Sequence, residues 1–355
     1  MKKIILCNTY YQLIFAMHLN RNLFYEDEVS LVMSDHSKGA KKVCENLNKM
    51  NIFKKVNYME VKWIRAENKR NILKTIVKLK NENIFSFVGN EKFDEFVFYN
   101  FDFVTNMLFQ KLYKKNKDIK VTRFEEGILT YNLPISFSIK MKMINIFNNL
   151  CRRPILTKKM SGFYCFYPSF YRGILLPIEI EPIKLDREFQ EILINSFNLS
   201  LDEDSYNQKY IFFTSVYDFE GGEPIGEYEL VCKVADIVGK ENLLVKTHPR
   251  DVRTIYEDNG FIVDKNSDIP WEAIQLSRDF SDKVFLTATS GSVLAGSFMS
   301  ENPPKTFFMH KCCNVSGNPV AQKSVGTIEE LLNDVSLKDS LKTVSKANDV
   351  RDILV

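Results

Sequence analysis

The chain has 355 residues, of which 45% are hydrophobic and 26% charged, as expected for a soluble globular protein with room for two domains. Its net charge of +3 hides an asymmetry: residues 1–180 carry 30 Lys and Arg against 16 Asp and Glu, a balance of +14, and residues 181–355 carry 18 against 29, a balance of −11. There is no run of 18 apolar residues, and the seven irregularly spaced cysteines include no CxxC pair, which argues against a membrane-spanning helix, a disulfide framework and a cysteine zinc site.

The first half of the chain alternates apolar strands with helices. Its opening, KKIILCNT followed by YYQLIFAMHLN, is interpreted as a strand and a helix and not as a signal peptide, because Asn8, Thr9 and Gln12 interrupt the apolar run. The expected strands are 3–8, 29–34, 95–100 and 119–124, and the expected helices are 10–22, 37–50, 67–81 and 103–116. Such alternation predicts a parallel sheet covered on both faces.

The second half repeats this alternation after an aromatic and proline-rich stretch at 145–180, which we interpret as a crossing between domains. The expected strands there are 209–216, 242–249, 261–264, 283–288 and 305–309, and the expected helices are 226–239, 253–260, 270–277 and 328–349. The sequence therefore predicts an α/β protein with two Rossmann-like domains, 1–165 and 166–355, that face each other across a cleft.

An acidic motif follows the strand expected at 119–124, at the sheet edge where parallel α/β proteins bind ligands. It consists of Glu125, Glu126 and Gly127. Successive strand side chains point to opposite faces, so the two carboxylates are not expected to act as a pair. A carboxylate at this edge could take a proton from an attacking hydroxyl group.

Two further motifs follow strands of the second half and suit an anion. One joins basic side chains to a proline that holds the preceding histidine extended, and the other offers hydroxyl and backbone N–H groups at a helix start. They are Lys246, His248, Pro249 and Arg250 after one strand, and Thr289, Ser290, Gly291 and Ser292 after the other.

Other known motifs are absent. There is no GxGxxG, P-loop, GxSxG, HExxH or nucleic-acid module, so no dinucleotide cofactor and no nucleic-acid partner is expected. Asp202 and Asp204 form a DxD pair, but their polar loop between domains is not expected to hold a metal-bound sugar nucleotide.

The ordered set of three motifs resembles the bacterial sialyltransferases of the GT-B type. The opening ILCNTYYQL and the stretch DIPWE at 268–272 are similar to glycosyltransferase family 52, the lipooligosaccharide and capsule sialyltransferases. The resemblance implies an inverting transfer of sialic acid from CMP-sialic acid to a hydroxyl of a galactose-containing surface glycan. It implies no cofactor and no obligatory metal, since a monophosphate leaving group needs positive charge and hydrogen-bond donors.

The resemblance also implies roles for individual residues. Glu125 would be the general base, and His248 would bind the CMP phosphate and act as an acid on it. The other donor-binding residues would be Lys246 toward cytosine, Glu272 toward ribose, and Pro249, Thr289, Ser290 and Ser292 around the phosphate. The candidates for acceptor binding or for loop structure are Asn8, Thr9, Gln12, Glu126, Gly127 and Asp218. Asp218, Glu220 and Glu223, after the strand at 209–216, are rival carboxylates for the base.

Cysteine usage and charge bear on location, and the resemblance bears on partners. A cytoplasmic protein is expected, and the basic N-terminal half would place it on the inner face of the cell membrane, facing an anionic or membrane-linked acceptor. A homodimer would form through the aromatic segment 145–175.

Two other interpretations stay open. The KxHPR stretch followed by a Ser/Thr turn is also similar to the CDP-glycerol glycerophosphotransferases of cell-wall polymer synthesis. A non-catalytic protein that binds a nucleotide sugar would keep the same fold and would bind CMP without transfer.

Overall fold

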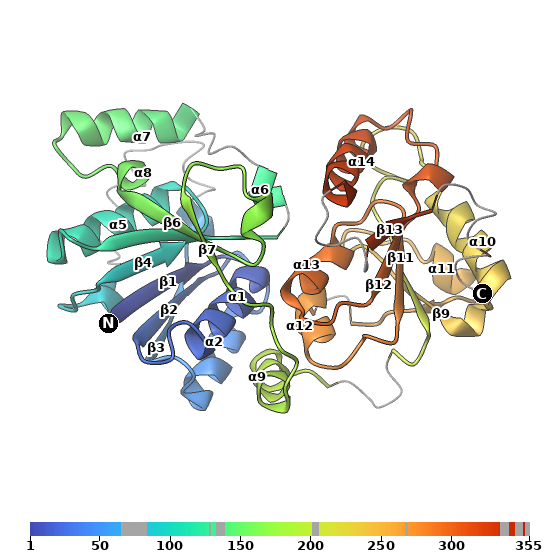
Figure 1. Ribbon diagram of the computed structural model, residues 1–355, viewed down its shortest axis with the longest axis horizontal. Coiled ribbons are helices and arrows are strands. Elements are labelled where there is room, and N and C mark those ends of the chain that lie inside the picture. Colours follow the sequence, from blue (N-terminus) through green and yellow to red (C-terminus); the bar gives the residue numbers. More distant parts are fainter. Residues whose placement is uncertain are drawn as a thin grey trace. The chain divides into compact units, whose positions relative to one another are not determined.

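The computed structural model describes residues 1–64, 84–127, 129–132, 139–200, 206–266, 269–333, 341–344 and 351. The chain divides into two compact units, Met1–Ile183 with Asn195–Phe197 and Lys184–Ile194 with Asn198–Val355. Each unit contains one parallel sheet flanked by helices (Figure 1), so the predicted α/β fold with two Rossmann-like domains is confirmed.

The first unit is built on a seven-stranded sheet in the order β3-β2-β1-β4-β5-β6-β7, with every pair parallel. Chain order runs in opposite directions from β1 and from β4, so the switch point at which α/β sheets bind ligands lies between these two strands. The strands are β1 (Lys2–Cys7), β2 (Glu28–Ser34), β3 (Lys55–Met59), β4 (Glu95–Phe98), β5 (Lys120–Phe124), β6 (Met160–Cys165) and β7 (Leu176–Glu179).

Helices cover both faces of this sheet (Figure 1). They are α1 (Tyr10–Arg21), α2 (Ala40–Met50), α5 (Phe103–Lys115), α6 (Leu129–Asn132), α7 (Ile139–Leu150) and α8 (Leu156–Lys159), with 3-10 turns η1 (Ser86–Val88) and η2 (Pro168–Phe170). Leu108 and Phe109 of α5 lie in one buried cluster with Ile4 of β1. On the other face, Phe15 of α1 stacks on Phe124 of β5 with ring centroids 5.4 Å apart. This packing fixes the carboxyl ends of β1 and β5 close to the start of α1.

The second unit is built on a six-stranded parallel sheet in the order β10-β9-β8-β11-β12-β13. Its strands are β8 (Tyr210–Phe213), β9 (Leu243–Lys246), β10 (Ile262–Val263), β11 (Val284–Thr287), β12 (Lys305–Phe308) and β13 (Leu341–Thr343). Its helices are α10 (Glu227–Val238), α11 (Ile255–Asp258), α12 (Trp271–Leu276), α13 (Ser292–Met299) and α14 (Pro319–Leu332), with 3-10 turns η3 (Lys240–Asn242) and η4 (His310–Cys312). The helix α9 (Arg187–Phe197) is divided, since its last three residues are grouped with the first unit. The central strand, β8, therefore lies between β9 and β11.

The stretch 145–180 differs from the sequence-based prediction of a crossing between domains. It forms the second half of α7 together with β6 and β7, and these two strands extend the first sheet. Phe163 and Cys165 of β6 are fully buried, so an apolar run without a clear period is here an interior strand. The sequence places the domain division between residues 165 and 166, whereas the contacts of the first unit continue to Ile183.

The C-terminal region also differs from the prediction of helix over 328–349. The helix α14 begins at Pro319 and ends at Leu332, and residues 341–343 form an edge strand that pairs with β12. The helix expected at 67–81 and the pair Asp202 and Asp204 lie outside the described residues. Across the described ranges, no helix has both the length and the apolar composition needed to cross a membrane.

Candidate active site

The acidic motif of the first unit lies at the carboxyl end of β5, beside the start of α1. Thr9 caps this helix by accepting a hydrogen bond from the Gln12 backbone N–H, and its hydroxyl donates to Glu126 Oε1 at 2.8 Å. A carboxylate near a helix N-terminus is also favoured by the helix dipole. The structure thus brings together the opening motif and the acidic motif, which are 117 residues apart in the chain.

Glu125 is fully buried. Tyr11 Oη donates to its Oε1 at 2.5 Å, and its Oε2 accepts from Tyr131 Oη and, at 3.0 Å, from the Phe166 backbone N–H. Burial raises the pKa of Glu125 to about 8, although the Tyr11 and Phe166 donors oppose the shift. A general base needs a pKa near the working pH and contact with the proton it takes. Glu125 has such a pKa, but an acceptor hydroxyl could reach it only if a tyrosine side chain moved.

Glu126 is only partly buried. Burial raises its pKa, and hydrogen bonds from Thr9 and Gln12 and the charge of Arg123 act in the opposite direction. Of the two carboxylates, Glu126 is the more exposed.

An amide network occupies the carboxyl ends of β1 and β4. Asn8 Nδ2 and Gln12 Nε2 both donate to Asn100 Oδ1, at 2.8 and 2.9 Å, and Ser34 Oγ donates to Asn8 Oδ1 at 2.6 Å. Asn8 and Gln12 were predicted from the sequence, whereas Asn100 and Ser34 were missed. A lone polar residue after a strand carries no motif, although its place at the end of a predicted strand was a usable signal.

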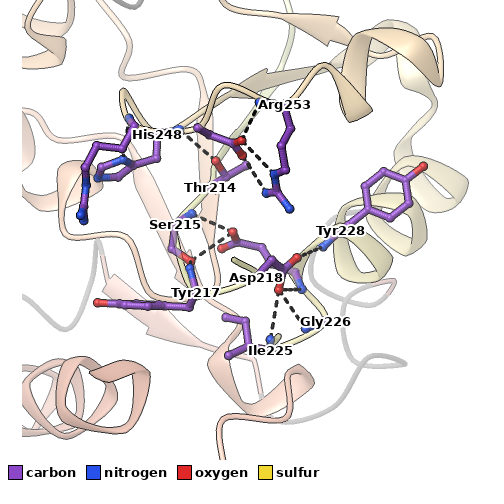
Figure 2. Close-up of polar contacts among 12 residues, drawn as sticks. Thr214, Ser215, Tyr217, Asp218, Ile225, Gly226, Tyr228, His248 and Arg253 are labelled. Atoms are coloured by element: carbon purple, nitrogen blue, oxygen red, sulfur yellow. Dashed lines mark hydrogen bonds and ion pairs between the residues drawn. The ribbon is translucent and has the colours of Figure 1, made fainter. Parts of the chain in front are cut away.

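In the second unit, three strand ends meet at the centre of the sheet. Phe213 of β8 pairs with Lys246 of β9 and with Thr287 of β11, so the residues after these strands lie in one row. Thr214 follows β8, and its hydroxyl accepts from the His248 backbone N–H at 3.0 Å (Figure 2).

The imidazole of His248 is oriented by its own loop. Its Nδ1 accepts from the Arg250 backbone N–H at 3.1 Å, so the neutral ring carries its proton on Nε2. Burial, and after it the charge of Arg250, lowers the pKa of His248. The ring is therefore a neutral hydrogen-bond donor near neutral pH.

The hydroxyls after β11 form the other side of this row. Ser290 Oγ and Ser292 Oγ are 2.8 Å apart, and the Ser290 backbone N–H donates to Thr287 Oγ1 at 2.8 Å. The buried Thr289 hydroxyl finds no hydrogen-bond partner among the described residues. A buried unpaired hydroxyl carries a free-energy cost that a ligand oxygen could relieve.

A model of the alpha-2,8-polysialyltransferase (POLYST) family matches residues 3–289 of the chain. The chain belongs to this family. It is therefore a glycosyltransferase of the sialyltransferase type, as the motifs predicted. No curated protein matches this family member.

Solved structures extend the likeness to the fold. An alpha/beta-galactoside alpha-2,3-sialyltransferase from the luminous marine bacterium Photobacterium phosphoreum is 13% identical, with 98% of each chain covered and a TM-score of 0.51. A UDP-N-acetylglucosamine 2-epimerase from Rickettsia bellii is 14% identical, with 93% of this chain and 88% of that chain covered and a TM-score of 0.41. The likeness to the Photobacterium enzyme shows a shared fold.

In this sialyltransferase-family chain, Lys246 lies in a buried ion pair. Its Nζ is 2.7 Å from Asp264 Oδ2 and 5.4 Å from the centroid of the Trp271 ring, and Tyr206 Oη donates to Asp264 Oδ1 at 2.8 Å. The predicted contact of Lys246 with cytosine stays a prediction, and no sequence motif pointed to Asp264 as its partner.

The carboxylate of Asp218 caps the start of α10. Its Oδ1 accepts from the backbone N–H groups of Ile225, Gly226 and Glu227, each at 3.1 Å, and its Oδ2 accepts from that of Tyr228 at 3.0 Å (Figure 2). With four donors on its two oxygens, this candidate has a loop-ordering role. The rival carboxylate Glu220 forms an exposed ion pair with Arg250 at 2.7 Å.

Glu227 is a buried carboxylate that sequence analysis missed, because a glutamate in the first turn of an amphipathic helix is common and marks no site. Its Oε2 accepts from the Ser215 backbone N–H at 2.7 Å and from the Ser215 hydroxyl at 3.1 Å. Burial raises the pKa of Glu227 to about 8. This carboxylate holds the loop after β8, and so it supports Thr214 indirectly.

The remaining predicted residues lie on turns and helix ends. Gly127 has a φ of 75°, the left-handed region that favours glycine, and it turns the chain after the two carboxylates. Pro249 follows His248 in the loop after β9, and Glu272 lies in the first turn of α12. Among the described residues, no group of three or more His, Cys, Asp or Glu side chains could hold a metal ion.

Proposed function

We propose that this chain transfers sialic acid from CMP-sialic acid to a hydroxyl group of a galactose-containing surface glycan, with inversion and without an obligatory metal. Membership of the polysialyltransferase family supports the sialyl group as the transferred unit. A nucleotide-sugar donor and a glycan acceptor follow from the same class of enzyme.

The observation that carries the donor assignment is the row of neutral hydrogen-bond donors after β8, β9 and β11. His248 can donate from Nε2, and Thr289 and Ser290 supply hydroxyl groups at a neighbouring strand end. These groups suit a leaving group with a single phosphate, because they can stabilise its growing negative charge as the bond to the sugar breaks. His248 would donate a hydrogen bond from Nε2 to a phosphate oxygen and keep its proton.

Glu125 is proposed as the general base. A pKa of about 8 supports this role, since a base is most effective when its pKa lies near the working pH. The hydroxyl of the acceptor would lose its proton to Glu125 as its oxygen attacks the anomeric carbon of sialic acid. Tyr11 or Tyr131 would have to move when the acceptor binds, because both now donate to this carboxylate.

Two kinds of oligosaccharide are candidates for the acceptor. The family is named for an alpha-2,8 linkage in polysialic acid, whereas the Photobacterium enzyme is named for an alpha-2,3 linkage to galactoside. Both a sialic acid-terminated and a galactose-terminated oligosaccharide therefore belong in the assay.

The deciding experiment measures CMP release from CMP-sialic acid, with each oligosaccharide and with EDTA present. We expect acceptor-dependent release that EDTA does not reduce, and a product one sialic acid heavier by mass spectrometry. CDP-glycerol serves as the competing donor. Turnover of CDP-glycerol with none of CMP-sialic acid would assign the chain to phosphodiester transfer instead, and CMP binding without any transfer would indicate a binding protein.

The basic N-terminal half supports a peripheral association with anionic membranes, and we also propose a homodimer. Sedimentation with vesicles that contain anionic lipid, at low and high salt, checks the first proposal. Light scattering of the purified protein checks the second.

A further inference from the structure

We propose that Asn100 binds the acceptor sugar: its Nδ2 donates to one sugar hydroxyl, while Glu126 accepts from a neighbouring hydroxyl. This assignment rests on the proposed transfer to a glycan, but it concerns a residue to which neither the motifs nor the family resemblance gives a role. The ligand class is a carbohydrate with adjacent hydroxyl groups.

Asn100 lies where α/β sheets bind ligands. It follows β4, which is placed between β1 and β5 in the first sheet, and the strand order reverses between β1 and β4. Asn8 follows β1 and Glu126 follows β5, so the three strand ends form one continuous polar edge.

The hydrogen bonds of Asn100 fix which way its amide points. Its Oδ1 accepts from both Asn8 Nδ2 and Gln12 Nε2, so Oδ1 faces the protein and Nδ2 is left as a donor. The Gln12 amide is itself oriented, because its Oε1 accepts from the Asn8 backbone N–H at 2.7 Å. Nδ2 of the partly buried Asn100 donates to no protein atom among the described residues.

Two completely buried side chains hold this arrangement. Gln12 and Ser34 are each 0% exposed, and Ser34 Oγ donates to Asn8 Oδ1. Buried polar side chains add little more stability than apolar side chains of the same size would. When all their hydrogen bonds are made, however, they hold the neighbouring side chains in one orientation. Here the group that they orient is the amide of Asn100.

Gln12 also connects Asn100 to Glu126. Its side-chain amide donates to Asn100 Oδ1, and its backbone N–H donates to the Thr9 hydroxyl, which in turn donates to Glu126 Oε1 at 2.8 Å. Asn100 and Glu126 are therefore both held by the start of α1. A sugar offers neighbouring hydroxyls that can each donate and accept, so one can accept from Asn100 Nδ2 while another donates to Glu126.

Kinetics of Asn100→Ala and Asn100→Asp test the assignment. We expect Asn100→Ala to raise the KM for the better acceptor about tenfold, the usual effect of one lost hydrogen bond, with the KM for CMP-sialic acid unchanged. Asn100→Asp keeps the shape and the bonds to Asn8 and Gln12 but cannot donate, so it should raise the acceptor KM at least as much.

Asn20→Ala is the matched control. Asn20 is also a partly buried amide of the first unit, and its Nδ2 donates to the Ile52 carbonyl at 2.8 Å, away from the polar edge. Its loss should lower Tm without changing the acceptor KM. An Asn100 variant whose acceptor KM stays within about twofold of the wild type would overturn the assignment, as would an equal rise for Asn20→Ala.

Saturation-transfer NMR with the oligosaccharide alone separates this assignment from the proposed reaction. Binding that is lost in Asn100→Ala, in a wild-type protein that releases no CMP, would support the sugar site and refute the transfer. Transfer by the wild type with unchanged binding by Asn100→Ala would refute the sugar site and support the reaction. Absence of both binding and transfer in the wild type would refute both.

Discussion

Glu125 and Glu126 are adjacent in the chain but lie in opposite surroundings. Glu125 is fully buried with three donors, and Glu126 is partly buried at the start of α1. The motif predicted that the two would not act as a pair, since neighbouring strand residues face apart. The structure adds a second difference, since the two side chains differ in burial as well as in the direction in which they point.

Glutamine variants separate the roles of these two residues. We expect Glu125→Gln to lower kcat by a factor of roughly 10² to 10⁴, the range for a lost general base, with the KM of the donor unchanged. Glu126→Gln should mainly raise the acceptor KM. Near-normal kcat in Glu125→Gln together with a collapse of kcat in Glu126→Gln would move the base to Glu126.

The pKa of Glu227 predicts how stability depends on pH. Because the folded value is about 8 and the ordinary value is 4.5, the folded protein binds this proton more tightly than the unfolded chain does. Stability from this group is complete below pH 4.5 and is lost as the pH rises toward 8. Glu227→Gln removes the titration and should flatten that decline.

Urea unfolding at about pH 5, 7 and 9 measures this slope for wild type and Glu227→Gln. Glu257, which lies on the exposed side of the short helix α11, supplies a control as Glu257→Gln, with no expected change. Identical slopes for wild type and Glu227→Gln would show that Glu227 keeps an ordinary pKa.

At the scale of elements, the sequence predicted the strands well where apolar runs end in polar motifs. The runs before Asn8, Glu125 and His248 are strands, and these residues lie at carboxyl ends as expected. β6 and β7 were missed because the sequence of an interior strand, apolar on both faces, does not alternate, and so it resembles an aromatic loop. The edge strand β13 was missed because its three residues carry no pattern that differs from a helix.

The site was predictable only as far as its motifs extended. Motifs placed the carboxylates, His248 and the serines, since each stands directly after a strand. Asn100 and Thr214 also follow strands, but neither Asn100 between two aromatic residues nor the Thr214–Ser215 pair forms a known motif. The ion pair of Lys246 with Asp264 joins the end of β9 to the residue after β10, so only the fold reveals it.

The start of α10 offers a test of element stability. Asp218→Ala removes a carboxylate that accepts four backbone N–H groups, and should cost about 1–2 kcal/mol, the usual value of a helix cap. Tm should fall by roughly 2–4 °C for a chain of this size. CMP affinity should stay close to that of the wild type, because Asp218 does not belong to the row that contains His248.

Asp236→Ala is the matched control for this helix. Asp236 is exposed in the last turn of α10, at the opposite end from the Asp218 cap, so its loss should change Tm by less than a degree or so. A fall in Tm as large for Asp236→Ala as for Asp218→Ala would show that helix charge, and not the cap, is responsible.

At the scale of the whole molecule, the two units carry different halves of the proposed chemistry. The proposed acceptor groups and Glu125 belong to the first sheet, and the groups proposed for CMP belong to the second. Each unit has its own buried core. The acceptor glycan and CMP should therefore slow hydrogen exchange in different parts of the chain.

Hydrogen exchange with CMP tests this division. We expect slower exchange at 214–218, 247–251 and 288–293, the loops after β8, β9 and β11, and little change at 8–12 and 125–127. UMP serves as the control nucleotide. Protection by CMP that is confined to 8–12 and 125–127 would place the nucleotide on the first sheet and reverse the proposed roles.

The all-parallel sheets have a practical consequence for anyone who wishes to attach this protein to a surface. Every proposed ligand group lies at or after the carboxyl end of a strand, so the loop that leads into β9 carries none of them. The turn Gly239–Asn242 before β9 is such a loop, and its residues are largely exposed. A peptide tag inserted there would lie at the opposite end of its own sheet from His248, leaving the proposed donor site unobstructed on an immobilised enzyme.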